Sequence, residues 1–422
     1  MWTLFLLFCR CAKSVFRGVP EERNYMKLEI IATSTFGLEA VVKREIEALG
    51  YKIIQSEDAK ITFLGDERAV VRANLWLRTA DRVQIKMAEF KALEFEDLFQ
   101  QVKGIPWEEW IPIDGKFIVN GSSVKSKLSS VPACQSVAEK AIVERLKSVY
   151  DVDYFQKTGA LYDIKITLLK DRVTVTLDTT GPGLHKRGYR VAMVDAPMKE
   201  TLAAALVQLS FWKKGRLMVD PCCGSGTLPI EAALIGRNIA PGLNRKFTAE
   251  DWDAIPKHLW KEERTAAFEA IDYDTELEIY GFDINPAALK AAMENAEEAG
   301  VDDCITFSLG DAASLGRNGC LGGLNGSKSI RFAGRESGVM VTNPPYGERI
   351  GDQKSIDRIY ASFLKFFTDN PTWSLFMVTS DKTAERKSFG RPADRRRKLF
   401  NGRLEVCYYQ FHGQKPPKKM GE

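Results

Sequence analysis

An apolar run at residues 339–342, which predicts a buried strand, leads directly into Asn343, Pro344, Pro345 and Tyr346. The two prolines stiffen the backbone and remove amide donors, so carbonyl oxygens are left free to accept hydrogen bonds. The Asn343 side chain adds another acceptor, and the Tyr346 ring adds a flat face for stacking. We therefore expect a fixed pocket for a planar molecule that carries an NH2 group, with chemistry on that amine.

Asp220 opens a second motif, Asp-Pro-Cys-Cys-Gly-Ser-Gly-Thr, at the end of another apolar run. Its glycines, Gly224 and Gly226, let the backbone approach a ligand and turn sharply into the following helix. The third glycine of a dinucleotide-binding loop is absent. An Asp four residues before Gly-x-Gly instead matches the loop that holds the methionine part of S-adenosylmethionine.

Two further strand ends are acidic. Asp283 follows an apolar run at 279–282 and is placed to accept both ribose hydroxyls of a nucleoside. It lies 63 residues after Asp220, so residues 236–273 are interpreted as an insertion after the first helix. Asp311 ends a third run and fits the adenine amino group, although a single such Asp also fits a helix cap. With Asn343, these ends together indicate methyl transfer from S-adenosylmethionine to an amine.

Composition sets broader limits. The chain has 422 residues, 45% hydrophobic and 27% charged, with a net charge of +4, which is typical of a globular protein with two or three domains. Eight cysteines without a Cys-x-x-Cys pair and three separated histidines predict a reduced cytoplasmic compartment and no metal site. No apolar run approaches the ~20 residues of a membrane span. Residues 1–25 are interpreted as a disordered extension rather than a targeting peptide.

Two regions fit contacts with nucleic acid. Residues 381–422 carry 12 Lys and Arg against five Asp and Glu, most densely at 395–398. The stretch 121–130 is rich in Ser and Lys, which suits phosphate contacts from a loop. In both regions a solvated surface is the alternative explanation.

Hydrophobic periodicity predicts an α/β chain. Helices are expected at 36–49, 67–77, 95–102 and 133–150, and strands at 28–33, 52–55, 60–64, 83–90, 116–120, 161–168 and 172–178. This pattern predicts two small α+β units in series, and Gly181-Pro182-Gly183 marks the next junction. Near-continuous apolar strands at 217–219, 279–282, 305–309, 339–342, 374–379 and 403–411 then predict a doubly wound parallel sheet covered on both faces, and residues 319–328 a loop.

The chain resembles class I S-adenosylmethionine-dependent methyltransferases that modify exocyclic or amide nitrogens. More specifically, it is similar to the THUMP-domain 23S rRNA guanine-N2 methyltransferases of the RlmL/YpsC type. The resemblance runs from about Met26 to the C-terminus. Its most specific pieces are residues 184–190, 196–203, 220–227, 343–349 and 398–402. The sequence departs from the family in two ways. Residues 1–25 have no counterpart, and the sequence ends after one methyltransferase domain, so the resemblance does not imply the second modification that fused relatives would make.

The resemblance implies a domain order and roles for site residues. We expect a ferredoxin-like α+β unit at 26–82, a THUMP RNA-binding domain at 83–180 and a Rossmann-like methyltransferase domain at 181–422. Thr201 would begin the helix under the cofactor, and the loop from Asp220 through Gly224 to Gly226 would hold its methionine part. Asp283 would hold the ribose and Asp311 the adenine. The expected partner is RNA, namely 23S rRNA, with S-adenosyl-L-methionine as the cofactor.

The alternative functions differ in which amine receives the methyl group. Guanine N2, adenine N6 and a protein glutamine amide all present the same NH2 geometry to Asn343, so a DNA adenine-N6 methyltransferase is the nearest rival enzyme. A non-catalytic RNA-binding protein is the alternative from another class. The acidic strand ends favour catalysis, and the N-terminal half favours RNA.

Overall fold

The computed structural model describes residues 26–192, 198–315, 319–332, 337–345, 353–402 and 404–415, so the expectations for Tyr346 and for residues 1–25 lie outside the described part. The chain divides into two compact units. Unit 1 contains the described residues up to 34, residues 42–184 and residues 242–269, whereas unit 2 contains residues 35–41, residues 185–241 and the described residues from 270 onward.

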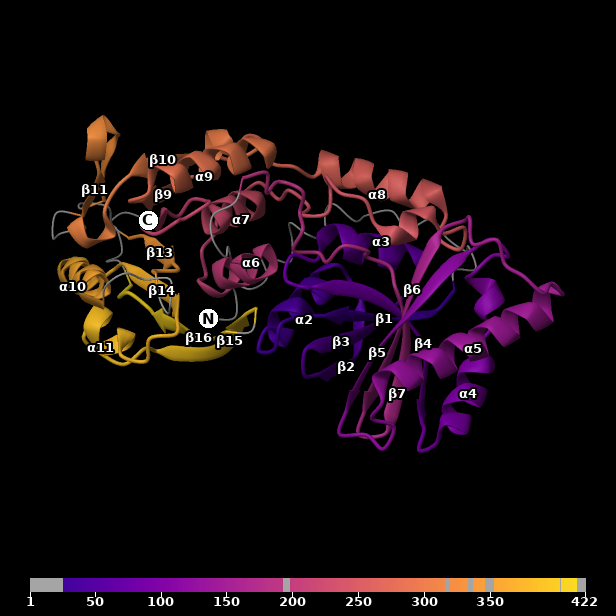
Figure 1. Cartoon of the computed structure of the whole chain (residues 1–422). Helices are drawn as coiled ribbons and strands as arrows, with labels where there is room; N and C mark the ends of the chain where they lie inside the picture. Colours follow the sequence, from indigo (N-terminus) through magenta and orange to yellow (C-terminus); the bar gives the residue numbers. More distant parts are fainter. Residues whose placement is uncertain are drawn as a thin grey trace. The chain divides into compact units, whose positions relative to one another are not determined.

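Unit 1 is built on one seven-stranded sheet (Figure 1). In spatial order its strands are β2 (Lys52–Glu57), β3 (Lys60–Gly65), β1 (Leu28–Thr33), β4 (Arg82–Lys91), β7 (Arg172–Asp178), β6 (Leu161–Leu169) and β5 (Lys116–Val124). Strand β4 pairs antiparallel with β1 on one side and with β7 on the other. The two α+β units expected in series therefore share a continuous sheet.

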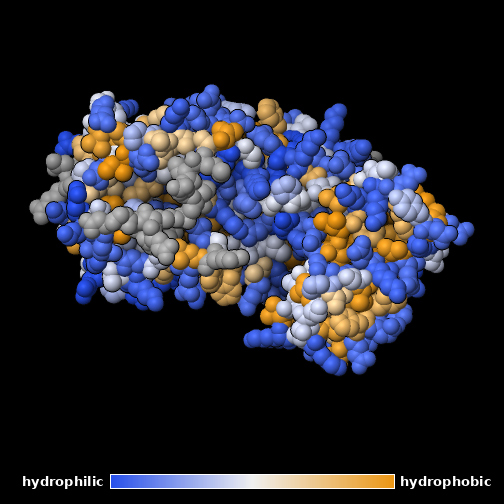
Figure 2. Space-filling view, in the orientation of Figure 1, coloured by the Kyte–Doolittle hydropathy of each residue, from blue (hydrophilic) through white to orange (hydrophobic). Residues whose placement is uncertain are grey.

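The helices of this part of the chain are α2 (Glu39–Ala48), α3 (Glu67–Trp76), α4 (Phe95–Lys103), α5 (Val131–Tyr150) and α8 (Lys257–Glu269). Alternate residues of β6 are buried, which is the pattern of a strand with one face on a core. Helices α4 and α5 pack side by side (Figure 1). On the face seen in Figure 2, hydrophilic side chains predominate, and the exposed apolar ones gather in patches, most densely in the right-hand part of the view.

The segment expected as an insertion supplies α8 and part of the unit 1 core. Trp252 is fully buried, stacks on Tyr162 with ring centroids 4.9 Å apart, and donates from Nε1 to the Leu161 carbonyl at 2.9 Å. Glu263, also buried, accepts from the Arg72 guanidinium at 2.8 Å and from Arg68. Residues 242–269 thus fold with the N-terminal half, although they follow the first helix of the methyltransferase-like half.

Unit 2 contains a second seven-stranded sheet. Its spatial order is β10 (Ile305–Leu309), β9 (Ile279–Asp283), β8 (Met218–Asp220), β13 (Val339–Thr342), β14 (Ser374–Thr379), β16 (Leu404–Phe411) and β15 (Arg395–Asn401). The first five strands are parallel, as expected. Strand β16 is antiparallel to both neighbours, so the expectation of a wholly parallel sheet is wrong. A two-residue connection joins β15 to β16, and such a short connection allows only antiparallel pairing.

Helices cover both faces of this sheet. They are α6 (Glu200–Leu209), α7 (Thr227–Gly236), α9 (Pro286–Glu298), α10 (Gln353–Asp369) and α11 (Ala384–Phe389). Within β13, Val339 and Val341 pack in the core formed with α6, α7 and α9, whereas Met340 packs in the core formed with α10. The predicted doubly wound α/β class is therefore confirmed.

Shorter elements complete the fold. The 3-10 turns are η1 (Trp107–Glu109), η2 (Thr248–Asp251), η3 (Asp302–Cys304), η4 (Ala312–Ser314) and η5 (Leu324–Gly326). Strands β11 (Cys320–Gly322) and β12 (Ser329–Arg331) pair antiparallel, so the loop expected at 319–328 begins with one strand of a small two-stranded ribbon whose other strand directly follows it. The basic cluster at 395–398, expected to contact nucleic acid or to form a solvated surface, lies in the edge strand β15, where charged side chains discourage pairing with other chains.

Candidate active site

A cavity of about 540 Å³ lies at the carboxyl ends of the parallel strands β8, β9, β10 and β13 in unit 2. This is the usual location of ligand sites in open α/β sheets, and the volume suits a nucleoside-sized ligand. Its lining includes Asp220, Gly224, Asp283, Asp311, Asn343, Pro344 and Pro345. The four strand ends chosen from the sequence are thus brought together.

The loop after β8 is shaped by its glycines. Gly224 has a φ of +54°, and its amide donates to Asp283 Oδ2 at 2.9 Å. A Cβ added to Gly224 would meet no atom within 4 Å, so the chain leaves open space there. At Gly226, with a φ of +82°, an added Cβ would lie 3.0 Å from the Ala292 Cβ on α9. Gly224 therefore leaves room beside the loop, whereas Gly226 permits close packing on a helix.

Asp220 is almost fully buried and connects two strand ends. Its Oδ1 accepts from the Thr342 hydroxyl at 2.8 Å and from the Cys222 amide at 3.1 Å. Burial raises the pKa of this carboxyl to about 7, while the two hydrogen bonds oppose the shift. The residue immediately before Asn343 is thereby hydrogen bonded to the loop after β8.

Asp283 and Asp311 occupy similar positions at the ends of β9 and β10. Asp283 accepts from the Gly224 amide through Oδ2 and from the Asn285 amide through Oδ1 at 2.9 Å. Each oxygen keeps acceptor capacity for a further donor. Asp311 caps the turn η4, with Oδ1 accepting from the Ala313 amide at 2.9 Å, and its Oδ2 lies 3.7 Å from Arg358. Asp311 therefore caps the turn through Oδ1, as the alternative interpretation of this residue predicted.

Asn343, Pro344 and Pro345 follow β13 and line the cavity. Asn343 Oδ1 is buried, yet it accepts no hydrogen bond from any residue that the structure describes. A buried acceptor without a donor is costly, so such an atom is expected to meet its donor in a ligand.

Residues 187–192, which we call the strap, hold the loop after β8 in place through hydrogen bonds. Arg190 donates to the Glu200 carboxylate at 2.7 Å, and its terminal nitrogens donate to Ser225 Oγ at 3.1 Å and Thr227 Oγ1 at 3.0 Å. Asn295, fully buried on α9, accepts from the amides of Val191 and Ala192. Its amide nitrogen donates to the Ser225 carbonyl at 3.1 Å.

Not every expected residue lines the cavity. Thr201 is buried in the first turn of α6, and neither it nor Gly226 is part of the described lining. Lining residues that were not predicted as site residues are Met198, Leu228, Ile284, Asn285, Ala288, Ala312 and Ile359. Ile284 and Asn285 directly follow Asp283, so they could have been predicted from their place at the carboxyl end of β9. Ile359 comes from α10, and no local signal connects it to the site.

The thiols in the loop are poor nucleophiles. Burial raises the pKa of both Cys222 and Cys223 well above the ordinary value, which keeps them protonated.

Within the described ranges, no three His, Cys, Asp or Glu side chains gather as a metal site would require. Among the helices described, none has the length and apolarity needed to cross a bilayer.

Family models match three stretches of the chain. Residues 29–84 match the RlmL ferredoxin-like domain, residues 92–178 the THUMP domain, and residues 187–410 the RMKL-like methyltransferase domain. The last match alone covers more than half of the chain. This chain belongs to the RMKL-like methyltransferase family. The predicted resemblance and enzyme class are therefore confirmed.

Individual relatives agree with the family. The chain is 47% identical to "Putative RNA methyltransferase YpsC" of Bacillus subtilis, with 93% of this chain and 98% of that protein covered. It is 33% identical to "Ribosomal RNA large subunit methyltransferase K/L" of Psychromonas ingrahamii over 89% of this chain and 49% of that protein. The chain thus spans about half the length of this second relative.

A solved structure bears on the cofactor. The structure of SMU.472, "a putative methyltransferase complexed with SAH", superposes with a TM-score of 0.84 at 41% identity and covers 93% of this chain and 99% of that one. The predicted cofactor, S-adenosyl-L-methionine, is confirmed by the family. The site fits it, because the loop leaves open space at Gly224 and carboxylates end three strands around the cavity.

Proposed function

We propose that this methyltransferase acts on the exocyclic amine of a base in RNA, namely N2 of a guanine in 23S rRNA. The observation that carries the proposal is Asn343 Oδ1, a buried acceptor in the cavity lining that no described residue satisfies. An amine N–H supplies the missing donor. Substrate NH2 groups on guanine, adenine or glutamine all fit this acceptor, so the choice among them rests on other features.

RNA is favoured by the N-terminal half. Residues 92–178 match the THUMP domain, and the relatives named above are described as methyltransferases of RNA and of large-subunit ribosomal RNA. DNA adenine methylation needs no such module, and methylation of a protein glutamine would not need it either. Guanine N2 in 23S rRNA follows from the RlmL-type resemblance.

We assign the cofactor contacts as the strand ends suggest. The loop from Asp220 through Gly224 to Gly226 would hold the methionine part, Asp283 the ribose and Asp311 the adenine. Thr201 would act from the helix beneath, without lining the cavity. Bound S-adenosylmethionine supplies an electrophilic methyl group on a sulfonium.

The chain's own residues act by positioning. An exocyclic amine is a poor nucleophile because its lone pair is delocalised into the ring. Asn343 Oδ1 and the Pro344 carbonyl would each accept one N–H, which draws the nitrogen toward tetrahedral geometry. In this assignment Tyr346 would stack on the base, and Pro345 would stiffen the turn. A paired base must first leave its helix. Methyl transfer would then rely on orientation and electrostatics. The nitrogen would gain the methyl group and give up one N–H proton to water, and S-adenosylhomocysteine would leave with the electron pair of the carbon–sulfur bond.

The domain limits at 26–82, 83–180 and 181–422 and the cytoplasmic location stay predictions. The seven-stranded sheet of unit 1 crosses the first of these limits, because β4 pairs on both sides.

The function is tested by methyl transfer onto rRNA, tRNA and DNA from sources that lack the modification, followed by nucleoside mass analysis. We expect N2-methylguanosine in 23S rRNA. N6-methyladenine in DNA with no methylated guanosine in RNA would replace the proposal with its nearest rival. Cofactor binding without transfer to any nucleic acid would refute both.

A further inference from the structure

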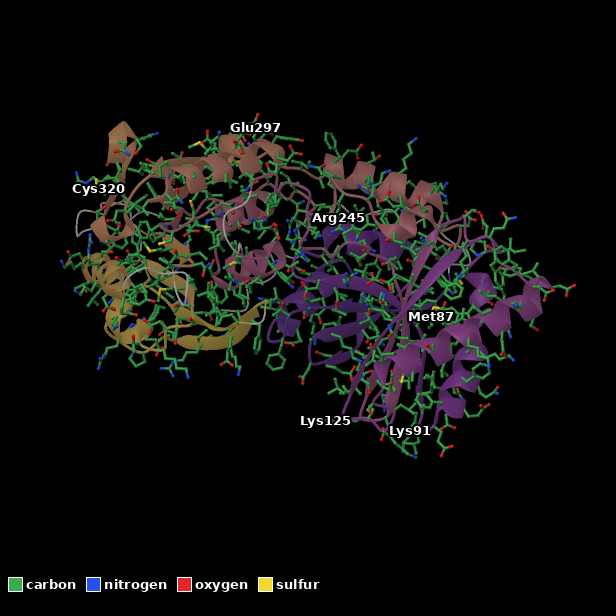
Figure 3. All side chains as sticks on the ribbon, viewed as in Figure 1. Met87, Lys91, Lys125, Arg245, Glu297 and Cys320 are labelled. Carbon is green, nitrogen blue, oxygen red and sulfur yellow. The ribbon has the colours of Figure 1, made fainter. Side chains whose placement is uncertain are left out.

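One end of unit 1 carries lysines that methyl transfer does not use. The amide of Lys170, in the β6–β7 turn, donates to the Val124 carbonyl at the end of β5 at 3.1 Å. The amide of Ala92, after β4, donates to the Asp171 carbonyl at 3.1 Å. Three chain segments therefore meet here. We name this region the basic tip and define it by its exposed Lys91, Lys125, Lys127, Lys170 and Arg172. Figure 3 shows Lys91 and Lys125 at this end of the unit.

Two of these lysines have an unfavourable backbone conformation. The β6–β7 register pairs Leu169 with Arg172, so Lys170 and Asp171 form a two-residue hairpin turn. Their φ angles are +51° and +67°, which is the turn type that Asn and Gly prefer because an L side chain crowds it. Lys125 has a φ of +52°. A lysine at such a position is less stable than Asn or Gly.

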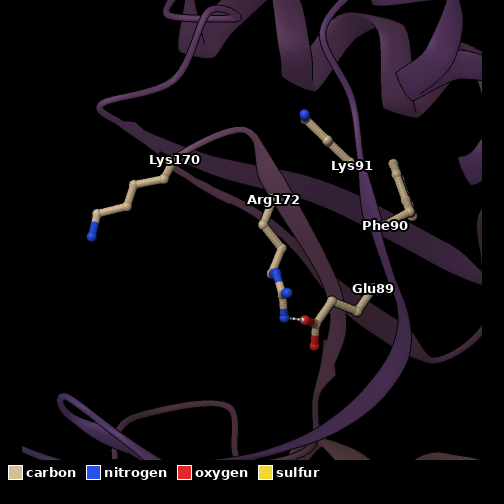
Figure 4. A pocket seen from close by; sticks show the side chains of 5 residues that line it. All are labelled: Glu89, Phe90, Lys91, Lys170 and Arg172. Atoms are coloured by element: carbon tan, nitrogen blue, oxygen red, sulfur yellow. Dashed lines mark hydrogen bonds and ion pairs between the residues drawn. The ribbon is translucent and has the colours of Figure 1, made fainter.

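The positive charges are largely uncompensated. Lys91, Lys170 and Arg172 line a cavity of about 360 Å³ together with Phe90 and Glu89, and Figure 4 shows Arg172 paired with Glu89. In the described part of the chain, no carboxylate lies within ion-pair distance of Lys91, Lys125, Lys127 or Lys170.

The nearby acids are already hydrogen bonded. Asp171 Oδ1 accepts from the Lys127 amide at 2.6 Å. Asp97 accepts from the amides of Leu93 and Glu94 at 3.1 Å, where it caps α4. These two carboxylates keep their charge but form no ion pair with the four lysines, whose ammonium groups stay open to an external anion.

We propose that the basic tip binds the sugar–phosphate backbone of the RNA substrate, an inference that rests on the proposed function. Ammonium groups are point charges that contact phosphates without reading bases, and the one guanidinium is already paired. Binding here is therefore sequence-independent and strongly dependent on salt. The tip holds the RNA while another part of the chain selects the base.

The test compares two full-length double variants of equal charge. Lys125→Gln with Lys170→Gln removes two tip charges. The control, Lys116→Gln with Lys157→Gln, removes two exposed charges at the opposite end of β5 and β6, and Lys157 also has a positive φ of +53°. The probes are a fluorescent oligouridylate and an unmodified 23S rRNA transcript. We expect the tip variant to bind both ~10-fold more weakly and to lower the slope of log affinity against log salt by about 1.4.

A second variant separates binding from folding. Lys170→Asn relieves the turn, so we expect a higher Tm together with weaker RNA binding. Equal RNA affinities in the two double variants would overturn the proposal, and would also be the result if the tip bound an acidic protein. Failure of the proposed function looks different, because wild-type protein would then methylate no RNA at all.

Discussion

The Thr342 hydroxyl donates a 2.8 Å hydrogen bond to Asp220 Oδ1, and this contact connects the proposed cofactor loop to the end of the strand that precedes Asn343. Asp220 is buried and its carboxyl pKa is raised to about 7. The ionisation of one side chain is thus linked to both halves of the site.

Cofactor affinity should consequently depend on pH. Burial disfavours the Asp220 carboxylate, so its contribution to the free energy of unfolding falls as pH rises from the ordinary Asp range toward 7. A bound cation favours the carboxylate, so binding below pH 7 must release a proton. We expect the Kd for S-adenosylmethionine to decrease as pH rises to about 7 and then to level off. Calorimetry of Asp220→Asn should give a flat profile, and a wild-type affinity that weakened with rising pH would contradict the assignment.

Loss of the Asn343 acceptor should affect transfer rather than cofactor binding. Removing one positioned electrostatic partner costs ~10²–10³ in rate, so we expect Asn343→Ala to lose that much kcat. Single-turnover methylation of unmodified rRNA measures the loss, and calorimetry checks that the cofactor still binds. Near-wild-type transfer by this variant would show that Asn343 does not hold the amine.

Arg190 should set the geometry of the cofactor loop. Its guanidinium donates to Glu200, Ser225 and Thr227, and it is not part of the described cavity lining. We expect Arg190→Ala to raise the KM for S-adenosylmethionine ~10-fold with a much smaller change in kcat. Lysine has a single donor nitrogen, so Arg190→Lys should rescue only part of the effect.

Arg237 provides the matched control. It is also largely buried and pairs with Asp303 in the same unit, but it does not touch the loop. Arg237→Ala should lower the Tm while leaving the KM unchanged. If both variants shifted the KM equally, Arg190 would have only a general structural role.

Glu263 should stabilise unit 1 specifically. Its buried carboxylate accepts from Arg68 and Arg72, and removing one partner of a buried pair costs roughly 3 kcal/mol. We expect Glu263→Gln to lower the free energy of unfolding by about that amount in denaturant titrations. Glu262 is half exposed and also contacts Arg68, so Glu262→Gln should cost no more than ~0.5 kcal/mol. Equal effects would mean that burial does not govern this network.

The four strand ends were predictable because strand periodicity and the order of parallel strands fix which residues meet at one sheet edge. Strand β1 has the expected bounds, and β13 ends where the Asn-Pro-Pro-Tyr motif begins. The strap was not predictable, because Asn295 reaches Ala192 across 103 residues through a helix face that looks like any other. The antiparallel β15 was missed because a run of arginines resembles a solvated surface.

The location of residues 242–269 has a consequence for how this protein can be taken apart. The chain passes between the two units five times, so no single cut releases either of them whole. A fragment that starts near residue 185 would carry Trp252 and Trp260 without the β-sheet that buries them, and should aggregate. During synthesis, unit 1 cannot complete its core until residue 269 has left the ribosome, by which time the first strand and helix of the catalytic sheet have already emerged. Neither unit can therefore be produced as one uninterrupted stretch of this chain.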